Sequence, residues 1–198
     1  MSITLEIPSL AHKKACEKMI AEWMRFGGEI HPGLLRRYSE RQGVVRYEQW
    51  LEQLVETEDE QQLYFLMQEQ RMLGAIALRP HEQGESLLVN GHCGYGIRPS
   101  ERRKGYAVQM LWLALPLLRG KGVCTAVITC DRNNLASAST ILRCKGIEAG
   151  EILDPDTGGI NRIFKICLSD GCFCPGFVSF FVSLLQSGKK YGTLIKQS

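Results

Sequence analysis

Residues 97–107 read IRPSERRKGYA, between a glycine-rich segment and an apolar run at 107–118. The apolar run is typical of a helix buried against a sheet. At a helix N-terminus the first backbone N–H groups have no partner within the helix, and the helix dipole is positive there. Gly105 lets a ligand approach the backbone closely, and residues 102–104 add positive charge. The stretch therefore predicts a site for phosphate groups, although a basic, solvated turn that merely starts a helix has the same pattern.

Other phosphate-binding motifs do not fit the chain. A dinucleotide-binding fingerprint would need a further glycine three residues after Gly96, where Pro99 stands. The GxxxxGK[ST] loop and the GxSxG nucleophile elbow are both absent from the sequence. Phosphate recognition, if present, therefore depends on the 97–107 stretch.

The composition is that of a folded domain. The chain has 198 residues, of which 44% are hydrophobic and 23% charged, and this excludes collagen-like and disordered classes. A net charge of +3 is too small to indicate a nucleic-acid partner. The sequence shows neither a secretory signal nor an apolar run of about 18 residues, so we expect a cytoplasmic protein without a membrane span. Eight cysteines include no CxxC pair, and no metal site is predicted.

Apolar periodicity predicts an α/β, or layered α+β, domain over residues 1–168. The 87–97 segment is rich in glycine, so a strand there implies that something approaches its backbone closely. Residues 27–45 show no clear period and are interpreted as an irregular connection. Residues 169–198 form a tail rich in phenylalanine and cysteine whose role stays open. Strands are expected at 3–7, 63–66, 72–78, 87–97, 123–129 and 160–168, and helices at 11–26, 47–55, 107–118 and 134–143.

Two blocks of the sequence resemble the GNAT (Gcn5-related) N-acetyltransferases. Arg102-x-x-Gly105-x-Ala107 resembles their [QR]-x-x-G-x-[GA] acyl-CoA loop, and the strand end Ile97-x-Pro99 precedes it as in that family. VITC at 127–130, followed by Asn134, Ser137 and Gly146, is similar to their fifth strand and the helix after it. More narrowly, 91–107 and 128–138 are similar to a bacterial group of predicted acetyltransferases.

The resemblance implies a mixed, mostly antiparallel sheet flanked by helices, with acetyl-CoA as co-substrate. It implies that an amine attacks the thioester directly within a ternary complex, so that no cysteine nucleophile is needed. Catalysis then depends on positioning and on a backbone N–H near Ile97 that polarises the thioester carbonyl. The pyrophosphate would bind the amides of the loop, the pantetheine arm would pair beside 97–99, and Asn134 would help hold it. The implied cofactor-binding residues are Ile97, Arg98, Pro99, Arg102, Arg103, Lys104, Gly105, Tyr106, Ala107 and Asn134.

The sequence departs from the family at the usual general acid. The family's tyrosine, seven residues after the Asn134 position, is Ile141 here, and Lys145 replaces a usual glycine. His92 and Tyr95 are the catalytic candidates, because their side chains suit proton transfer. Three residues apart on an expected strand, they should point to opposite faces, so at most one lines the site. Each also has a structural interpretation as a core residue.

The acceptor is predicted to be a small-molecule or peptide amine. Residues 27–45, with Glu29, His31 and Tyr38, lie where the family places acceptor-binding loops, although a solvated loop is the simpler interpretation. The alternative function is a catalytically silent CoA-binding or regulatory module, which the missing tyrosine permits. A nucleic-acid-associated protein is disfavoured by the small net charge. Whether the chain forms a homodimer stays open.

Overall fold

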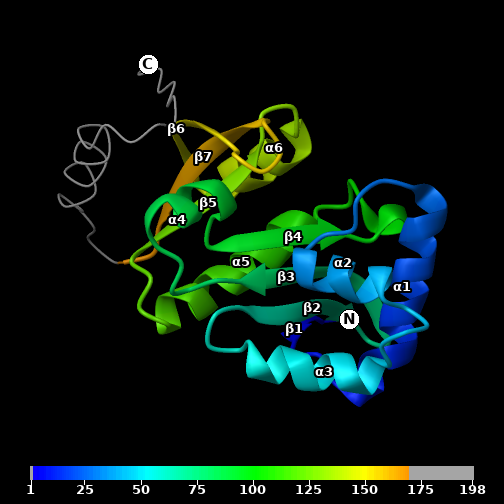
Figure 1. The fold of residues 1–198 in the computed structure, drawn as a ribbon. Coiled ribbons are helices and arrows are strands. Elements are labelled where there is room, and N and C mark those ends of the chain that lie inside the picture. Colours follow the sequence, from blue (N-terminus) through cyan, green and yellow to red (C-terminus); the bar gives the residue numbers. More distant parts are fainter. Residues whose placement is uncertain (1, 170–198) are drawn as a thin grey trace.

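The structure is a computed structural model that describes residues 2–169. Within these residues the chain forms seven strands and six α-helices (Figure 1). In chain order they are β1 (Ile3–Glu6), α1 (Lys13–Phe26), α2 (Gly33–Glu40), α3 (Tyr47–Glu56), β2 (Gln62–Gln68), β3 (Arg71–Leu78), α4 (Gly84–Asn90), β4 (Cys93–Ile97), α5 (Tyr106–Gly120), β5 (Thr125–Asp131), α6 (Leu135–Arg143), β6 (Ile147–Leu153) and β7 (Ile160–Cys167).

The strands form two antiparallel sheets. One has the order β1-β2-β3-β4 and the other the order β5-β7-β6, so β4 and β5 are both edge strands. The sheets meet where the His92 N–H donates to the Val127 carbonyl at 2.7 Å. Figure 1 shows the smaller sheet and α6 above the four-stranded sheet. The predicted α/β fold with mostly antiparallel strands is confirmed, and it is divided between β4 and β5.

Helices cover both faces of the four-stranded sheet, because its inner strands are apolar on both sides. Phe65 and Ala75 belong to a core with α1, α2 and α3. Leu66 and Ile76, one residue further along each strand, belong to a second core with α5, α6 and the smaller sheet. Side chains alternate across a strand, so neighbouring residues enter different cores.

The expectation of an irregular connection at 27–45 was wrong for its central part, which forms α2. Leu34, Leu35 and Tyr38 are buried on one face of this helix, at helical spacing. The charged residues between them conceal that period in the sequence. The burial of three large side chains in the first core explains why the segment folds as a helix.

The expected strand at 87–97 was also wrong in its first half. Residues 84–90 form α4, which ends at Gly91 with a φ of 66°. Leu87 and Leu88 pack against Val127 and Ile163. An apolar run of three residues is too short to separate helix from strand by periodicity. The strand itself, β4, begins only at Cys93, so His92 precedes it.

The strand β6 was not expected. It pairs with β7 and has a register irregularity between Glu148 and Gly150. Most of its side chains are partly or fully exposed, so it lacks the apolar alternation that marks a half-buried strand. Apart from Ser169, the predicted tail at 169–198 lies outside the described residues. Between residues 2 and 169, no helix is both long and apolar enough to cross a membrane.

Candidate active site

The loop before α5 presents a row of backbone N–H groups. Gly105 is the N-cap of α5 and has a φ of 86°, a left-handed conformation that suits glycine. Within the described residues, no acceptor contacts the backbone N–H groups of residues 103–107. A Cβ at Gly105 would have no atom within 4 Å, so the space beside this turn is open. The residues present fit an anion such as a pyrophosphate.

Glu22 of α1 anchors the start of this loop. Its Oε2 accepts from Arg98 Nε at 2.6 Å and its Oε1 from the Ser100 N–H at 2.8 Å. Burial opposes ionisation, but the bonds from Ser100 and Arg98 outweigh it and lower the pKa of Glu22 to about 2. Arg98 is 8% exposed. Its side chain therefore holds the loop to α1, while its backbone N–H and carbonyl bond to Leu73 and Glu101.

Glu101 anchors the loop on the other side. This carboxylate is buried, and it accepts from Arg71 Nε at 2.8 Å and from Lys104 Nζ at 2.9 Å. Charge-assisted hydrogen bonds of this kind are shorter and stronger than neutral ones. The two carboxylates, Glu22 and Glu101, thus fix both ends of the 98–104 segment before any ligand binds.

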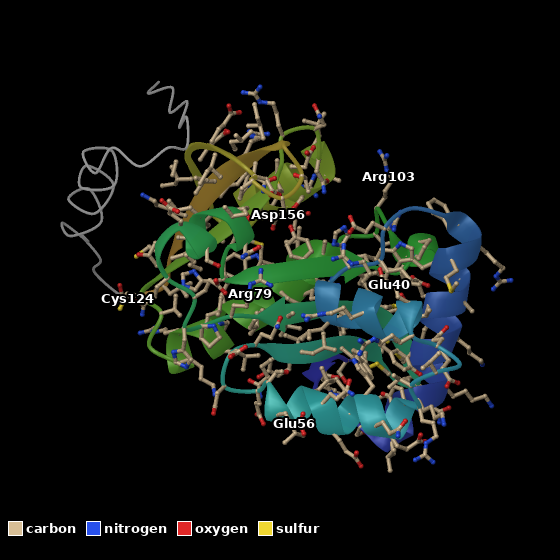
Figure 2. All side chains as sticks on the ribbon, viewed as in Figure 1. Glu40, Glu56, Arg79, Arg103, Cys124 and Asp156 are labelled. Carbon is tan, nitrogen blue, oxygen red and sulfur yellow. The ribbon has the colours of Figure 1, made fainter. Side chains whose placement is uncertain are left out.

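The remaining two cations of the loop differ in their surroundings. The Arg102 guanidinium lies 4.9 Å from the Trp23 ring centroid and 5.1 Å from that of Phe26, both on α1. Arg103 has no partner within residues 2–169. Figure 2 shows its side chain extending away from the ribbon. Of the four basic residues expected at the site, Arg103 is therefore the one whose side chain has no partner among the described residues.

The hydrogen bonds at the two ends of β4 show which of its residues bond to β3 and which do not. The Arg98 N–H donates to the Leu73 carbonyl at 2.9 Å, and the Arg79 N–H donates to the His92 carbonyl at 2.8 Å. Bonded residues alternate along an antiparallel pair, and the register from 93 to 97 is continuous. Residues 94 and 96 are therefore bonded to β3.

It follows that the N–H and C=O groups of Tyr95 and Ile97 face β5. Between the described parts of β4 and β5 no ladder forms. The Ile97 carbonyl instead accepts from Arg102 Nε at 3.2 Å. This open edge leads directly into the loop at 98–105. An extended ligand can thus pair with β4 while its charged end lies on the amides before α5.

Tyr95 links β4 to α6. Its hydroxyl lies 2.9 Å from the hydroxyl of Ser137 on α6, and its ring packs against the second core. Burial raises the pKa of Tyr95, so the phenol stays protonated at neutral pH. Ile141, at the position of the family's tyrosine, is completely buried. The Tyr95 hydroxyl is thus held in its protonated form beside Ser137.

His92 has a different environment. It is 6% exposed, and its Nδ1 accepts from the Val127 N–H at 2.9 Å. Burial lowers the pKa of His92 to about 4, so the ring is neutral. Because Nδ1 and the backbone N–H both bond to Val127, His92 joins the two sheets at the closed end of the gap.

Asn134 is the N-cap of α6. Its Oδ1 accepts from the Ser137 N–H at 3.0 Å. The cap uses only the oxygen, so the amide group of this exposed side chain is free to donate. The structure thereby brings Asn134, Ser137 and Tyr95 to one side of the gap between β4 and β5.

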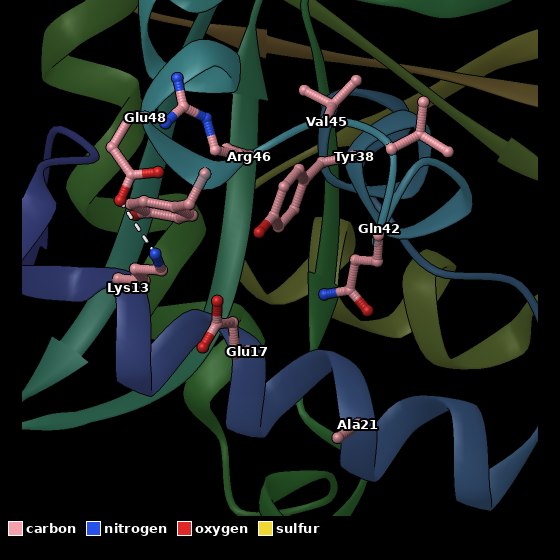
Figure 3. A pocket seen from close by; sticks show the side chains of 11 residues that line it. Lys13, Glu17, Ala21, Tyr38, Gln42, Val45, Arg46 and Glu48 are labelled. Atoms are coloured by element: carbon pink, nitrogen blue, oxygen red, sulfur yellow. Dashed lines mark hydrogen bonds and ion pairs between the residues drawn. The ribbon is translucent and has the colours of Figure 1, made fainter.

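A hollow of about 470 Å³ lies at a different place, between α1 and residues 38–48 (Figure 3). Lys13 and Glu48 form an ion pair of 2.9 Å at one end, and Tyr38 and Gln42 face α1. None of the lining residues belongs to β4 or to the 98–105 loop. The volume of a hollow does not by itself identify the reactive site.

Residues 7–146 match the family model described as the acetyltransferase (GNAT) domain. The chain belongs to the GNAT acetyltransferase family. The predicted family, the enzyme class of acyl-CoA-dependent N-acetyltransferases and acetyl-CoA as acyl donor are confirmed. None of the curated proteins matches the sequence significantly.

Solved structures share the GNAT fold at low sequence identity. An acetyltransferase of Salmonella typhimurium that modifies the N-terminal serine of a 50S ribosomal subunit protein has 13% identity and a TM-score of 0.62, covering 85% of this chain and 96% of its own. The microcin C7 self-immunity acetyltransferase MccE, in complex with acetyl-CoA and AMP, has 17% identity and a TM-score of 0.62, and the match covers 83% of this chain and 92% of MccE. Mutant forms of the spermidine/spermine N-acetyltransferase SpeG from Vibrio cholerae have 12% identity and a TM-score of 0.57, and the match covers 84% of this chain and 95% of SpeG.

Glu22 is a site residue that the sequence analysis of this GNAT chain missed. Its carboxylate is 76 positions from Arg98 in sequence, within a helix that reads as an ordinary amphipathic surface helix. The glycine pattern of β4 was informative. A Cβ at Gly96 would lie 2.6 Å from both the His31 carbonyl oxygen and Trp23, so the close approach predicted for this segment is made by the chain itself.

Proposed function

We propose that this chain transfers the acetyl group of acetyl-CoA to a primary amine by direct attack within a ternary complex. The observation that carries the proposal is the continuity between the open edge of β4 and the amide-lined loop before α5. The pantetheine arm pairs with Tyr95 and Ile97, and the pyrophosphate binds the N–H groups of residues 103–107 with Arg103 beside it. The GNAT domain at 1–168 carries the activity.

The backbone of Ile97 is well placed to polarise the thioester carbonyl. Its N–H faces the open edge. The residues on either side of it, Gly96 and Arg98, pair with β3 and so fix the direction of this N–H. A fixed donor of this kind stabilises the negative charge that develops on the thioester oxygen. The Tyr95 hydroxyl then supplies a proton to the departing CoA sulfur, with Ser137 as its hydrogen-bond partner.

Cysteines near the gap are unsuited to an acyl-enzyme route. Burial raises the pKa of Cys130, that of Cys93 to about 12 and that of Cys144 to about 11. A thiolate is the nucleophilic form, so these thiols are unreactive at neutral pH. This supports direct attack by the amine.

The fold neighbours suggest a first set of acceptor amines to test. One of them modifies a protein N-terminus and another acetylates polyamines. We therefore select three probes: a peptide amide that begins with serine, a lysine peptide with a blocked N-terminus, and spermidine. The preferred acceptor is a peptide or small-molecule amine in the cytoplasm.

Calorimetric titration with acetyl-CoA, and with ATP as the control, is the first test. We expect micromolar affinity for acetyl-CoA and none for ATP, because only the former offers an arm that pairs with β4. Steady-state thiol release with the three probes then tests turnover. Intersecting double-reciprocal plots are expected for a ternary complex, whereas parallel lines would indicate an acyl-enzyme. Binding without turnover of any amine would instead identify a silent CoA-binding module.

A further inference from the structure

A second histidine lies against β4 on the face opposite Tyr95. His31 stands in the connection between α1 and α2, and a Cβ at Gly96 would lie 2.6 Å from the His31 carbonyl oxygen and 3.0 Å from its Cβ. Gly96 lies between Tyr95 and Ile97, whose backbone groups face the open edge. Side chains alternate across a strand, so His31 is on the α1 and α2 side and Tyr95 on the α5 side.

The imidazole has a carboxylate partner. His31 Nε2 lies 3.6 Å from Glu29 Oε2, and Arg36 of α2 forms an ion pair with the other oxygen of Glu29. A carboxylate beside an imidazole orients the ring and stabilises its protonated form. About half of the His31 side chain is exposed, at 51%, so an amine from solvent can reach it.

Partial burial of the His31 ring, more than the charges around it, keeps the imidazole neutral at pH 7. Partial burial and the positive charge of Arg102 lower its pKa from the ordinary value. The titratable and charged groups that face it are Glu29 in its own connection, Arg36 on α2 and Arg102 in the loop before α5, and Glu40 lies 3.8 Å from Arg36. A neutral imidazole is the form that can accept a proton.

We propose that His31 accepts the proton of the incoming ammonium group, with Glu29 as the residue that positions it. This inference rests on the acetyltransferase function proposed above. The acceptor enters from the α1 and α2 side, and the thioester lies at the edge of β4. His92 is unsuited to this step, because it is buried and its Nδ1 is bonded to Val127.

The proton balance requires two separate groups. The ammonium gives one proton to His31, and the free amine forms the C–N bond as the C–S bond breaks. The nitrogen then loses its second proton to solvent, while the CoA sulfur takes one from Tyr95. His31 returns its proton to solvent, and Tyr95 regains one. The base and the acid thus lie on opposite faces of β4.

The pH dependence of kcat with the serine-initiated peptide tests His31. His31→Gln should lower kcat by about 100-fold or more and remove the acidic limb of the profile, while the Kd of acetyl-CoA changes less than about twofold. Glu29→Gln should lower kcat by about tenfold and move that limb to lower pH, because the imidazolium loses its carboxylate. His81→Gln, at an exposed histidine after β3, is the matched control with an unchanged profile. A normal kcat and acidic limb in His31→Gln overturn the inference.

NMR of the histidine rings gives a readout that needs no turnover. The His31 signal is identified by its loss in His31→Gln, and acetyl-CoA alone should shift it while the signals of His12 and His81 stay in place. If acetyl-CoA binds and the His31 signal does not move, the inference fails while the proposed function stands. If acetyl-CoA does not bind at all, the proposed function fails and the inference with it.

Discussion

The hydroxyl oxygens of Tyr95 and Ser137 lie 2.9 Å apart, although the first residue belongs to β4 and the second to α6. This contact crosses the gap between the two sheets at a point where their strands form no ladder. It places a protonated phenol next to the edge at which the thioester is expected. The tyrosine that often acts as the general acid in the family would lie on the helix, and here Ile141 fills that position with a buried aliphatic side chain.

Tyr95→Phe should lower kcat by about 100-fold, because the departing sulfur loses its proton donor. The Kd of acetyl-CoA should stay nearly constant, since the pairing with β4 uses backbone groups. Ser137→Ala is the control, because it breaks the same hydrogen bond and keeps the phenol. It should cost about 1 kcal/mol in free energy of unfolding and less than about fivefold in kcat. Equal losses of kcat in the two variants would show that Tyr95 acts only as a structural residue.

Gly105→Glu should weaken acetyl-CoA binding by at least about 100-fold in calorimetry. The new carboxylate would occupy the open space beside the turn and repel the pyrophosphate. The backbone φ of 86° adds a stability cost of about 1–2 kcal/mol.

Gly122→Glu is the matched control for this change. Gly122 follows α5, has a φ of 88° and also has open space around a Cβ. It should show the same loss of stability with unchanged affinity. Equal losses of affinity in both variants, or no loss in Gly105→Glu, would show that the loop does not bind CoA.

The local parts of this fold could be predicted from sequence. The loop and α5 depend on residues that are adjacent in the chain, so a glycine before an apolar helix already indicated a row of free amides. The strand β5 and helix α6 were equally recognisable, because VITC is apolar and β-branched and Asn134 is a typical N-cap. These are features that short-range patterns determine.

Contacts between distant segments could not be predicted in this way. Nothing near Glu22 in the sequence indicates that it meets Arg98, and nothing near His31 indicates that it lies on Gly96. The split of 87–97 into α4 and β4 was missed for a related reason. Leu87 and Leu88 adopt a helix because they pack on β5 and β7, and a single sequence does not show that tertiary contact.

Glu22→Gln should lower the free energy of unfolding by about 2 kcal/mol at pH 7, measured by urea denaturation. The folded pKa of Glu22, about 2, is below its ordinary value, so its stabilisation is complete above about pH 5 and is lost as the pH falls toward 2. The difference between wild type and Glu22→Gln should therefore shrink over that interval.

Glu48→Gln provides the comparison, because the Lys13–Glu48 pair has a similar length, 2.9 Å, and both of its side chains are well exposed. Exposed pairs contribute little, so Glu48→Gln should change the free energy of unfolding much less than Glu22→Gln does. A pH-independent difference for Glu22→Gln would contradict the role of the ionised carboxylate in holding the loop.

Two glycines of β4 separate steric from conformational effects. A Cβ at Gly96 would lie 2.6 Å from the His31 carbonyl oxygen and from Trp23, whereas one at Gly94 would meet only the Arg79 guanidinium at 3.7 Å. Gly96→Ala should therefore cost about 2–3 kcal/mol in thermal or urea unfolding, because backbone has to move. Gly94→Ala should be neutral or stabilising by about 0.5 kcal/mol, since alanine loses less backbone freedom on folding.

Because Gly96→Ala displaces His31 from the face of β4, kcat should fall further than acetyl-CoA affinity. If both variants unfold alike, His31 does not pack on β4 as the structure shows.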